Sequence, residues 1–175
     1  MRKVNFYVFV CTFLYLPVIV KSQTTTGKVY ATLQAVGYST ENVFAGGPQF
    51  SFGYAGNNFA IGPGVGLIIL GEDKPYIPLY LSMMYSGSKK KLSPMGSFHM
   101  GKGFYKGTSR FLDDEYYLIN AGFYGQVDIG LAIRIRSAKI HVMTGVTLMS
   151  FTAPGQNKDI NETLFNVGLG FFGTN

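Results

Sequence analysis

Alternation of apolar and polar side chains at every second position is the clearest pattern in this sequence. It is longest between Phe123 and Arg136, where one set of alternate residues is Phe123, Gly125, Val127, Ile129, Leu131, Ile133 and Ile135. A period of two is typical of a β-strand, whose side chains point in turn to opposite faces. The stretch is long for a soluble sandwich, whereas a strand tilted across a bilayer needs about 9–11 residues. The pattern therefore predicts a membrane-spanning strand.

Other stretches alternate less regularly and are also predicted to be strands. They are residues 28–38, 49–54, 59–69, 77–85, 95–104, 140–148 and 165–171. Pro63 falls inside one of them, and because proline has no N–H to donate we expect a bulge or kink there. About eight strands with an apolar outer face predict an all-β fold, an antiparallel up-and-down transmembrane β-barrel.

The lengths of the connections give this barrel a predicted orientation. Short turns at 55–58, 86–93 and 136–139 alternate with mostly longer connections at 39–48, 71–75, 105–120 and 152–160. Outer-membrane barrels have short periplasmic turns and longer extracellular loops. Every acidic residue except Asp128 falls in or beside a predicted outer loop, while Lys89, Lys90 and Lys91 fall in a predicted periplasmic turn.

The first 22 residues read as a cleaved signal peptide. Arg2 and Lys3 precede an apolar run over residues 6–20, and Ser22 lies at the expected cleavage point. The run is shorter than the about 20 residues that span a bilayer, although an uncleaved anchor is the alternative. We therefore predict two units, a signal peptide at 1–22 and one outer-membrane β-barrel domain at 23–175.

Cleavage changes the charge and the cysteine count. It removes three of the 15 basic residues and none of the nine acidic ones, so the net charge falls from +6 to +3. The remaining basic residues form no stripe, which argues against nucleic-acid binding. Cys11 is the only cysteine and leaves with the signal, so no disulfide or thiol chemistry is expected in the mature chain. Twenty-three glycines and 27 tyrosines and phenylalanines also suit a barrel better than a helical domain.

Charged residues on the inner face of the predicted strands form the main candidate constellation. Tyr124, Gln126, Asp128, Arg134 and Arg136 share the polar face of the longest strand, and Lys139 follows the turn after it. An eight-stranded barrel is just wide enough to be filled by side chains, so we expect Asp128, Arg134, Arg136 and Lys139 to form a structural ion-pair and hydrogen-bond network in the lumen with Gln126 and Tyr124. A narrow selective pore is the alternative. The acidic run Asp113 to Glu115 is interpreted as a solvated loop, with divalent-cation binding as the alternative.

Two motifs partly resemble functional sites, one a nucleotide-binding loop and the other a catalytic Ser/His pair, but each lacks required residues. Gly62-Pro63-Gly64-Val65-Gly66 lacks the third glycine and the following helix of a dinucleotide loop, so we interpret it as small residues on a crowded inner face. Ser97 and His99 loosely resemble the Ser and His of eight-stranded lipid A deacylases, but in reversed order and with no acid placed beside them. Two histidines without cysteines make a zinc site improbable. We expect no enzyme activity, cofactor or metal.

The sequence resembles small, porin-like outer-membrane β-barrel proteins of Bacteroidota. The resemblance rests on Gly62 to Gly66, Pro78 to Leu81, Lys89 to Pro94 and Gly101 to Phe104. The alternation from Phe165 to Phe172 is similar to the β-signal that the barrel-assembly machinery reads. The resemblance implies location in the cell outer membrane, with outer-membrane lipid, lipopolysaccharide and the assembly machinery as partners.

The resemblance says almost nothing about activity, and the sequence leaves the oligomeric state open. The leading hypothesis is a non-catalytic barrel with a structural or surface-interaction role. An outer-membrane lipid-modifying enzyme and a soluble periplasmic β-barrel that binds a lipophilic ligand are the alternatives.

Overall fold

The computed structural model describes residues 28–39, 44–56, 58–70, 74–87, 91–108, 116–136, 138–152 and 159–174. The predicted signal peptide and the acidic run at 113–115 lie outside the described residues. Every described element is a β-strand. They are β1 (Lys28–Ser39), β2 (Phe44–Ala55), β3 (Phe59–Gly66), β4 (Ile68–Leu70), β5 (Lys74–Ser86), β6 (Leu92–Thr108), β7 (Tyr116–Ile135), β8 (Ala138–Thr152) and β9 (Asp159–Thr174).

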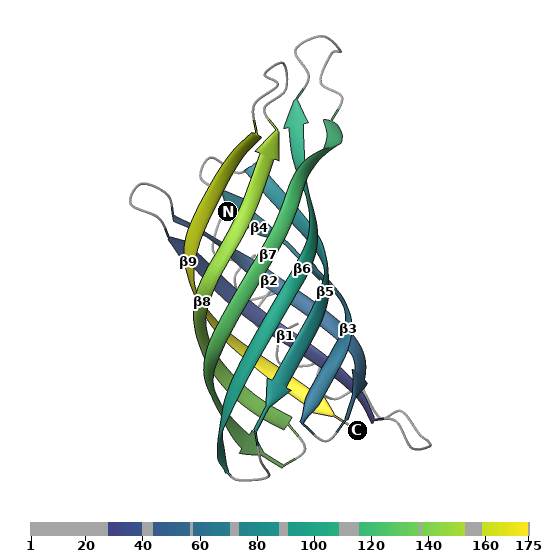
Figure 1. Ribbon diagram of the computed structural model, residues 1–175, viewed down its shortest axis with the longest axis vertical. Coiled ribbons are helices and arrows are strands. Elements are labelled where there is room, and N and C mark those ends of the chain that lie inside the picture. Colours follow the sequence, from purple (N-terminus) through teal and green to yellow (C-terminus); the bar gives the residue numbers. More distant parts are fainter. Residues whose placement is uncertain are drawn as a thin grey trace, which may run out of the picture.

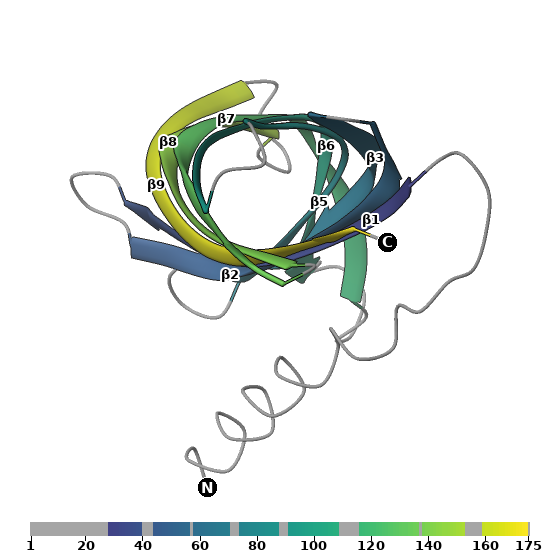
Figure 2. The ribbon, with the colours of Figure 1, turned by 90° about the horizontal axis from the view of Figure 1, so that it is seen from below.

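The strands form one closed antiparallel barrel. Consecutive strands are paired, except that β3 pairs with β5 and not with β4, and the pairing of β1 with both β2 and β9 closes the ring. β3 and β4 occupy a single place in the wall, because both pair with β2 and β5 and only Leu67 separates them. The wall therefore has eight places, as predicted. Figure 1 shows the strands tilted against the long axis, and Figure 2 shows the ring along that axis.

Of the bulge or kink expected at Pro63, the structure has no bulge. The pairing of β3 with β2 omits Gly62 and Pro63 and resumes in the same register, so no residue is inserted. Pro63 still faces Leu81 on β5. The missing N–H leaves a gap in one ladder, while the pairs on both sides keep the same register.

The one register shift that the structure records lies between β6 and β7. Gly103 pairs with Gly122 but Phe104 pairs with Asn120, so Ala121 is an extra residue on β7. Gly122 has a φ of 105°, a conformation that glycine adopts readily and other residues rarely do. Beyond this bulge both strands continue, and Tyr105–Thr108 and Tyr116–Asn120 are paired strand rather than the predicted loop 105–120. Phe44–Pro48 is likewise part of β2, not of the predicted loop 39–48.

The outer surface of the barrel is a broad apolar band. Exposed residues on β7 are Phe123, Val127, Ile129, Leu131, Ile133 and Ile135, and Val142, Leu148, Phe165 and Leu169 continue the band on β8 and β9. From Phe123 to Ile135 the chain rises about 40 Å, or about 28 Å along the normal at a tilt near 45°, which matches the about 25 Å lipid-facing band of outer-membrane barrels. Within the described residues, no helix is long and apolar enough to cross a membrane.

The interior is layered. Toward the end with the long connections lies an aromatic cluster that includes Tyr38, Tyr76, Tyr80 and Tyr124. Toward the end with the short turns lies a second cluster, which includes Tyr30, Met84, Met95, Met143 and Phe172. Buried polar side chains separate the two clusters; they include Gln34, Ser51, Ser82, Ser97, His99, Asp128 and Asn166.

Candidate functional site

Gln126 of β7 is the centre of the buried polar layer. Its Oε1 accepts hydrogen bonds from Gln49 Nε2 at 3.0 Å, from Tyr38 OH at 3.4 Å and from Tyr124 OH. Gln49 Nε2 also donates to Tyr124 OH at 2.8 Å. On its other side, Gln126 Nε2 donates to Asp128 Oδ2 at 2.8 Å. One amide therefore links strands β1, β2 and β7 through the middle of the barrel.

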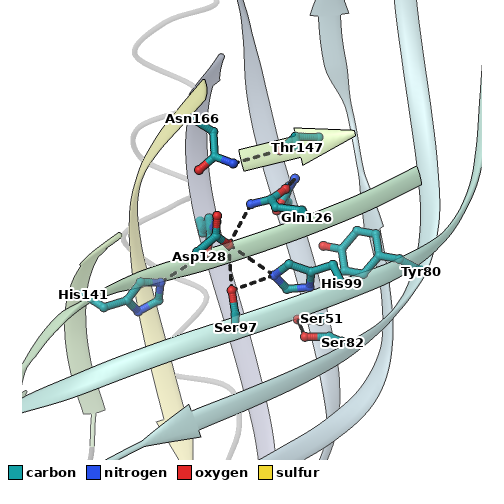
Figure 3. A network of polar contacts seen from close by, with 12 residues as sticks. Ser51, Tyr80, Ser82, Ser97, His99, Gln126, Asp128, His141, Thr147 and Asn166 are labelled. Carbon is teal, nitrogen blue, oxygen red and sulfur yellow. Dashed lines mark hydrogen bonds and ion pairs between the residues drawn. The ribbon is translucent and has the colours of Figure 1, made fainter. Parts of the chain in front are cut away.

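Asp128 joins this centre to a serine and a histidine of β6, as Figure 3 shows. Ser97 Oγ donates to Asp128 Oδ2 at 2.7 Å, and His99 Nε2 lies 3.1 Å from Ser97 Oγ and 3.7 Å from Asp128 Oδ2. The three side chains are almost completely buried, and the Tyr80 ring packs edge-on against His99 with centroids 4.8 Å apart. The acid that the sequence did not place beside Ser97 and His99 is Asp128.

This arrangement differs from a catalytic triad. In a triad the acid orients the histidine through one ring nitrogen, while the other nitrogen takes the proton of the serine. Here Ser97 donates directly to the acid, and both contacts of His99 use Nε2. His99 Nδ1 has no hydrogen-bond partner among the described residues. The geometry fits a structural network better than an activated serine.

The structure divides the residues that the sequence grouped into two sets. Gln126 and Asp128 are buried and hydrogen-bonded to each other. Arg134 lies six positions after Asp128 along β7, about 20 Å away. It is exposed at the end with the short turns. Arg136 is also exposed there, with a φ of 56° in the turn after β7. The side chains share one face in sequence, but the strand carries them from the middle of the barrel to its end, where Arg134 pairs with Lys139 of β8.

Glycines on intervening strands let larger side chains meet. His141 Nε2 of β8 lies 3.3 Å from Gln34 Oε1 of β1. This contact is possible because Gly170 of β9, which lies between them, has no side chain. A Cβ on Gly170 would lie 2.6 Å from His141 Nε2 and 2.7 Å from Gln34 Cβ. Ser51 Oγ reaches Ser82 Oγ at 3.4 Å across β3, where a Cβ on Gly64 would lie 2.9 Å from Ser51 Cβ. The crowded glycine face predicted at Gly62–Gly66 is present.

A separate cavity opens at the end with the short turns. Its volume is about 390 Å³. Three cationic residues, Lys28, Arg134 and Lys139, line it together with the apolar side chains Met84 and Phe172. The sequence pattern predicted no cavity here. Its signal was a basic residue at the inward position of three strand ends; the turn after β7 brings Arg134 and Lys139 together, and closure of the ring adds Lys28.

Comparison with known proteins identifies the fold. No protein-family model matches the sequence, and no curated protein is similar to it. Among solved structures, the barrel is similar to Neisserial surface protein A, with a TM-score of 0.63, 12% identity, and coverage of 87% of this chain and 99% of that chain. It is also similar to the N-terminal β-barrel domain of OprF from Pseudomonas aeruginosa, with a TM-score of 0.50, 10% identity, and coverage of 86% and 100%.

These similarities concern the architecture. They agree with the closed eight-place wall and the apolar band, which are the two properties that let strands cross a lipid bilayer. The chain is an all-β barrel of the outer-membrane type.

Proposed function

We propose that this protein is a non-catalytic outer-membrane barrel whose lumen is closed by side chains, and that it has a structural or surface-interaction role. The observation that carries the closed lumen is the 3.0 Å hydrogen bond between Gln49 and Gln126. β2 and β7 lie on opposite walls, with three places between them in either direction around the ring. A bond between their side chains crosses the full width of the lumen.

The layers on both sides of this bond support the same proposal. Tyr38 and Tyr124 are completely buried above it, and Tyr30 and Met84 are buried toward the other end. Side chains of this size fill the interior of an eight-stranded barrel. The proposed role is therefore carried by the surfaces and connections of the barrel and not by passage of a solute through its centre.

A lipid-modifying enzyme receives less support from the same site. Ser97 and His99 point into the polar layer and are 5% and 2% exposed. An acyl chain in the membrane would meet the outer face of β6, where Phe98 and Met100 lie instead. Lipid A from cells with Ser97→Ala should have the same mass spectrum as lipid A from wild-type cells, and a changed acyl pattern would favour the enzyme.

A soluble periplasmic barrel is disfavoured by the outer surface. Such a barrel turns polar residues outward, whereas here Ile129 is 68% and Val167 61% exposed. The proposal includes a cleaved signal at 1–22, assembly by the barrel-assembly machinery, a lipid and lipopolysaccharide environment, and membership of the Bacteroidota group on the motifs given above. N-terminal sequencing of the membrane-inserted protein should begin at Gln23.

Conductance measurements in planar bilayers test the closed lumen. The folded wild-type protein should give no discrete current steps at high salt. A variant in which glycine replaces Tyr38, Gln49 and Gln126, and also Tyr30, Met84 and Phe172 of the second cluster, lacks both closing layers and should produce steps. Folding of both proteins is verified by heat-modifiable gel migration. Discrete steps from the wild-type protein would show an open pore and overturn the proposal.

A further inference from the structure

The cavity at the end with the short turns has the composition of an anion site. We propose that it binds an amphiphilic anion, with a phosphate or carboxylate head on Lys28, Arg134 and Lys139 and an apolar part over Met84 and Phe172. The proposal does not depend on whether the barrel conducts, because the cavity lies at the mouth and not in the polar layer.

Positive charge is concentrated at the mouth of the cavity. Arg134 of β7 and Lys139 of β8 are direct partners across the ladder. Like charges placed directly opposite each other destabilise a sheet. Lys28 of β1 adds a third positive charge to the same lining, and no described lining residue is Asp or Glu. A bound anion at this mouth would be attracted by all three cations.

Hydrogen bonds of the fold hold the lining residues of the cavity in place. Lys139 Nζ donates a hydrogen bond to Ser86 Oγ of β5, which brings its charged end across the mouth. The amide of Ser86 is itself held by the carbonyl of Asn58 at 2.8 Å, and the amide of Arg134 by the carbonyl of Lys91 at 2.8 Å. The backbone positions of two lining residues are therefore tied to the turns around the mouth.

The apolar floor of the cavity and its volume indicate the chemical class of the ligand. Met84 is 2% and Phe172 6% exposed, and both belong to the apolar cluster that closes the lumen beneath the cavity. A volume of about 390 Å³ lies within the range of small-molecule sites, which combine apolar walls with a few polar groups. Inorganic phosphate would contact the three cations alone, whereas an anion with a short alkyl or glyceride part would also pack against Met84 and Phe172.

Calorimetric titration of the full-length protein, folded in nonionic detergent, tests the site with hexyl phosphate. We expect saturable binding that is weaker for inorganic phosphate and absent for 1-hexanol. Lys28→Gln and Lys139→Gln should each weaken hexyl phosphate binding by about tenfold or more, since each removes a charge-assisted contact. Lys102→Gln is the matched control, because Lys102 is exposed on β6 and does not line the cavity.

Several results would overturn the proposal. They are the absence of saturable binding, an equal loss in Lys102→Gln, and equal binding of 1-hexanol. Inorganic phosphate binding as tightly as hexyl phosphate would overturn the role of the floor. All variants are first shown to fold by heat-modifiable migration.

A second measurement distinguishes the source of the anion. Native mass spectra are recorded after release from nanodiscs of phosphatidylcholine and phosphatidylglycerol. Phosphatidylglycerol retained by the wild type and lost in Lys28→Gln and Lys139→Gln identifies a lipid headgroup. Hexyl phosphate binding without retained lipid identifies a free organic phosphate.

Discussion

Ser97 and Asp128 face each other across the β6–β7 ladder, and Ser97 Oγ donates a hydrogen bond to Asp128 Oδ2 at 2.7 Å. Gln126 Nε2 donates to the same oxygen at 2.8 Å. A buried carboxylate is costly unless donors satisfy it, and these two donors come from different strands. The Ser97–Asp128 bond therefore joins β6 to β7, and the two donors together satisfy one oxygen of the carboxyl group.

Removing the carboxylate tests this role. Asp128→Ala leaves the buried donors of Ser97 and Gln126 without their acceptor and should lower the free energy of unfolding by about 1–3 kcal/mol. Asp128→Asn should cost less, because its amide oxygen still accepts from Ser97 and the buried charge is gone. Urea titration of the protein in lipid vesicles measures both. Equal losses in the two variants would show that the hydrogen bonds contribute nothing.

The apolar band makes a depth-dependent prediction. Ile129 lies midway between Phe123 and Ile135 on the outer row of β7 and is 68% exposed. Ile129→Arg should therefore destabilise the membrane-inserted barrel by about 2–4 kcal/mol, the cost of Arg at the bilayer midplane. Thr163→Arg, at an exposed position near the long-connection end of β9, should cost about 0–1 kcal/mol. Folding yield in vesicles measures both, and equal tolerance would contradict a lipid-facing band.

Glycine packing gives a prediction inside the barrel. A Cβ on Gly103 would lie 1.9 Å from Tyr76 OH and 2.1 Å from Tyr76 Cζ. Gly103→Ala must therefore displace the ring, and overpacking of this kind costs about 1–3 kcal/mol. Gly37→Ala is the control, because the nearest atoms to its Cβ would be 3.9 Å away. Urea midpoints in detergent should fall for the first variant only, and an unchanged midpoint for Gly103→Ala would mean that Tyr76 moves freely.

Single cysteines test the orientation of the barrel. Glu162 is exposed near the long-connection end and Lys91 is exposed at the short-turn end. If the short turns face the periplasm, a membrane-impermeant maleimide labels Glu162→Cys on intact cells and Lys91→Cys only after permeabilisation. The sole native cysteine, Cys11, lies within the predicted signal and gives no background after cleavage. Labelling of Lys91→Cys alone on intact cells would invert the orientation.

The sequence by itself determined the barrel. A period of two is a local property of each strand, so the apolar outer face of Phe123–Ile135 could be read without knowing its neighbours. The even strand count and the alternation of short and longer connections followed from the same reading. The predicted loops were too long because pairing of β6 with β7 continues past the bulge at Ala121, and a bulge leaves no mark in the apolar pattern.

Only the tertiary structure decided which inward residues meet. The sequence placed Ser97, His99 and Asp128 on inner faces, but their contact depends on a register in which Ser97 pairs with Asp128. It also grouped Asp128 with Arg134, which the rise of the strand separates by about 20 Å. Arg134 keeps its predicted neighbour Lys139 at the mouth, whereas Gln126 meets Gln49 from the opposite wall, which the sequence did not indicate. Closure of the ring brings residues such as Gln49 and Gln126 together although they are far apart in sequence. The alternation within one strand carries no information about such contacts.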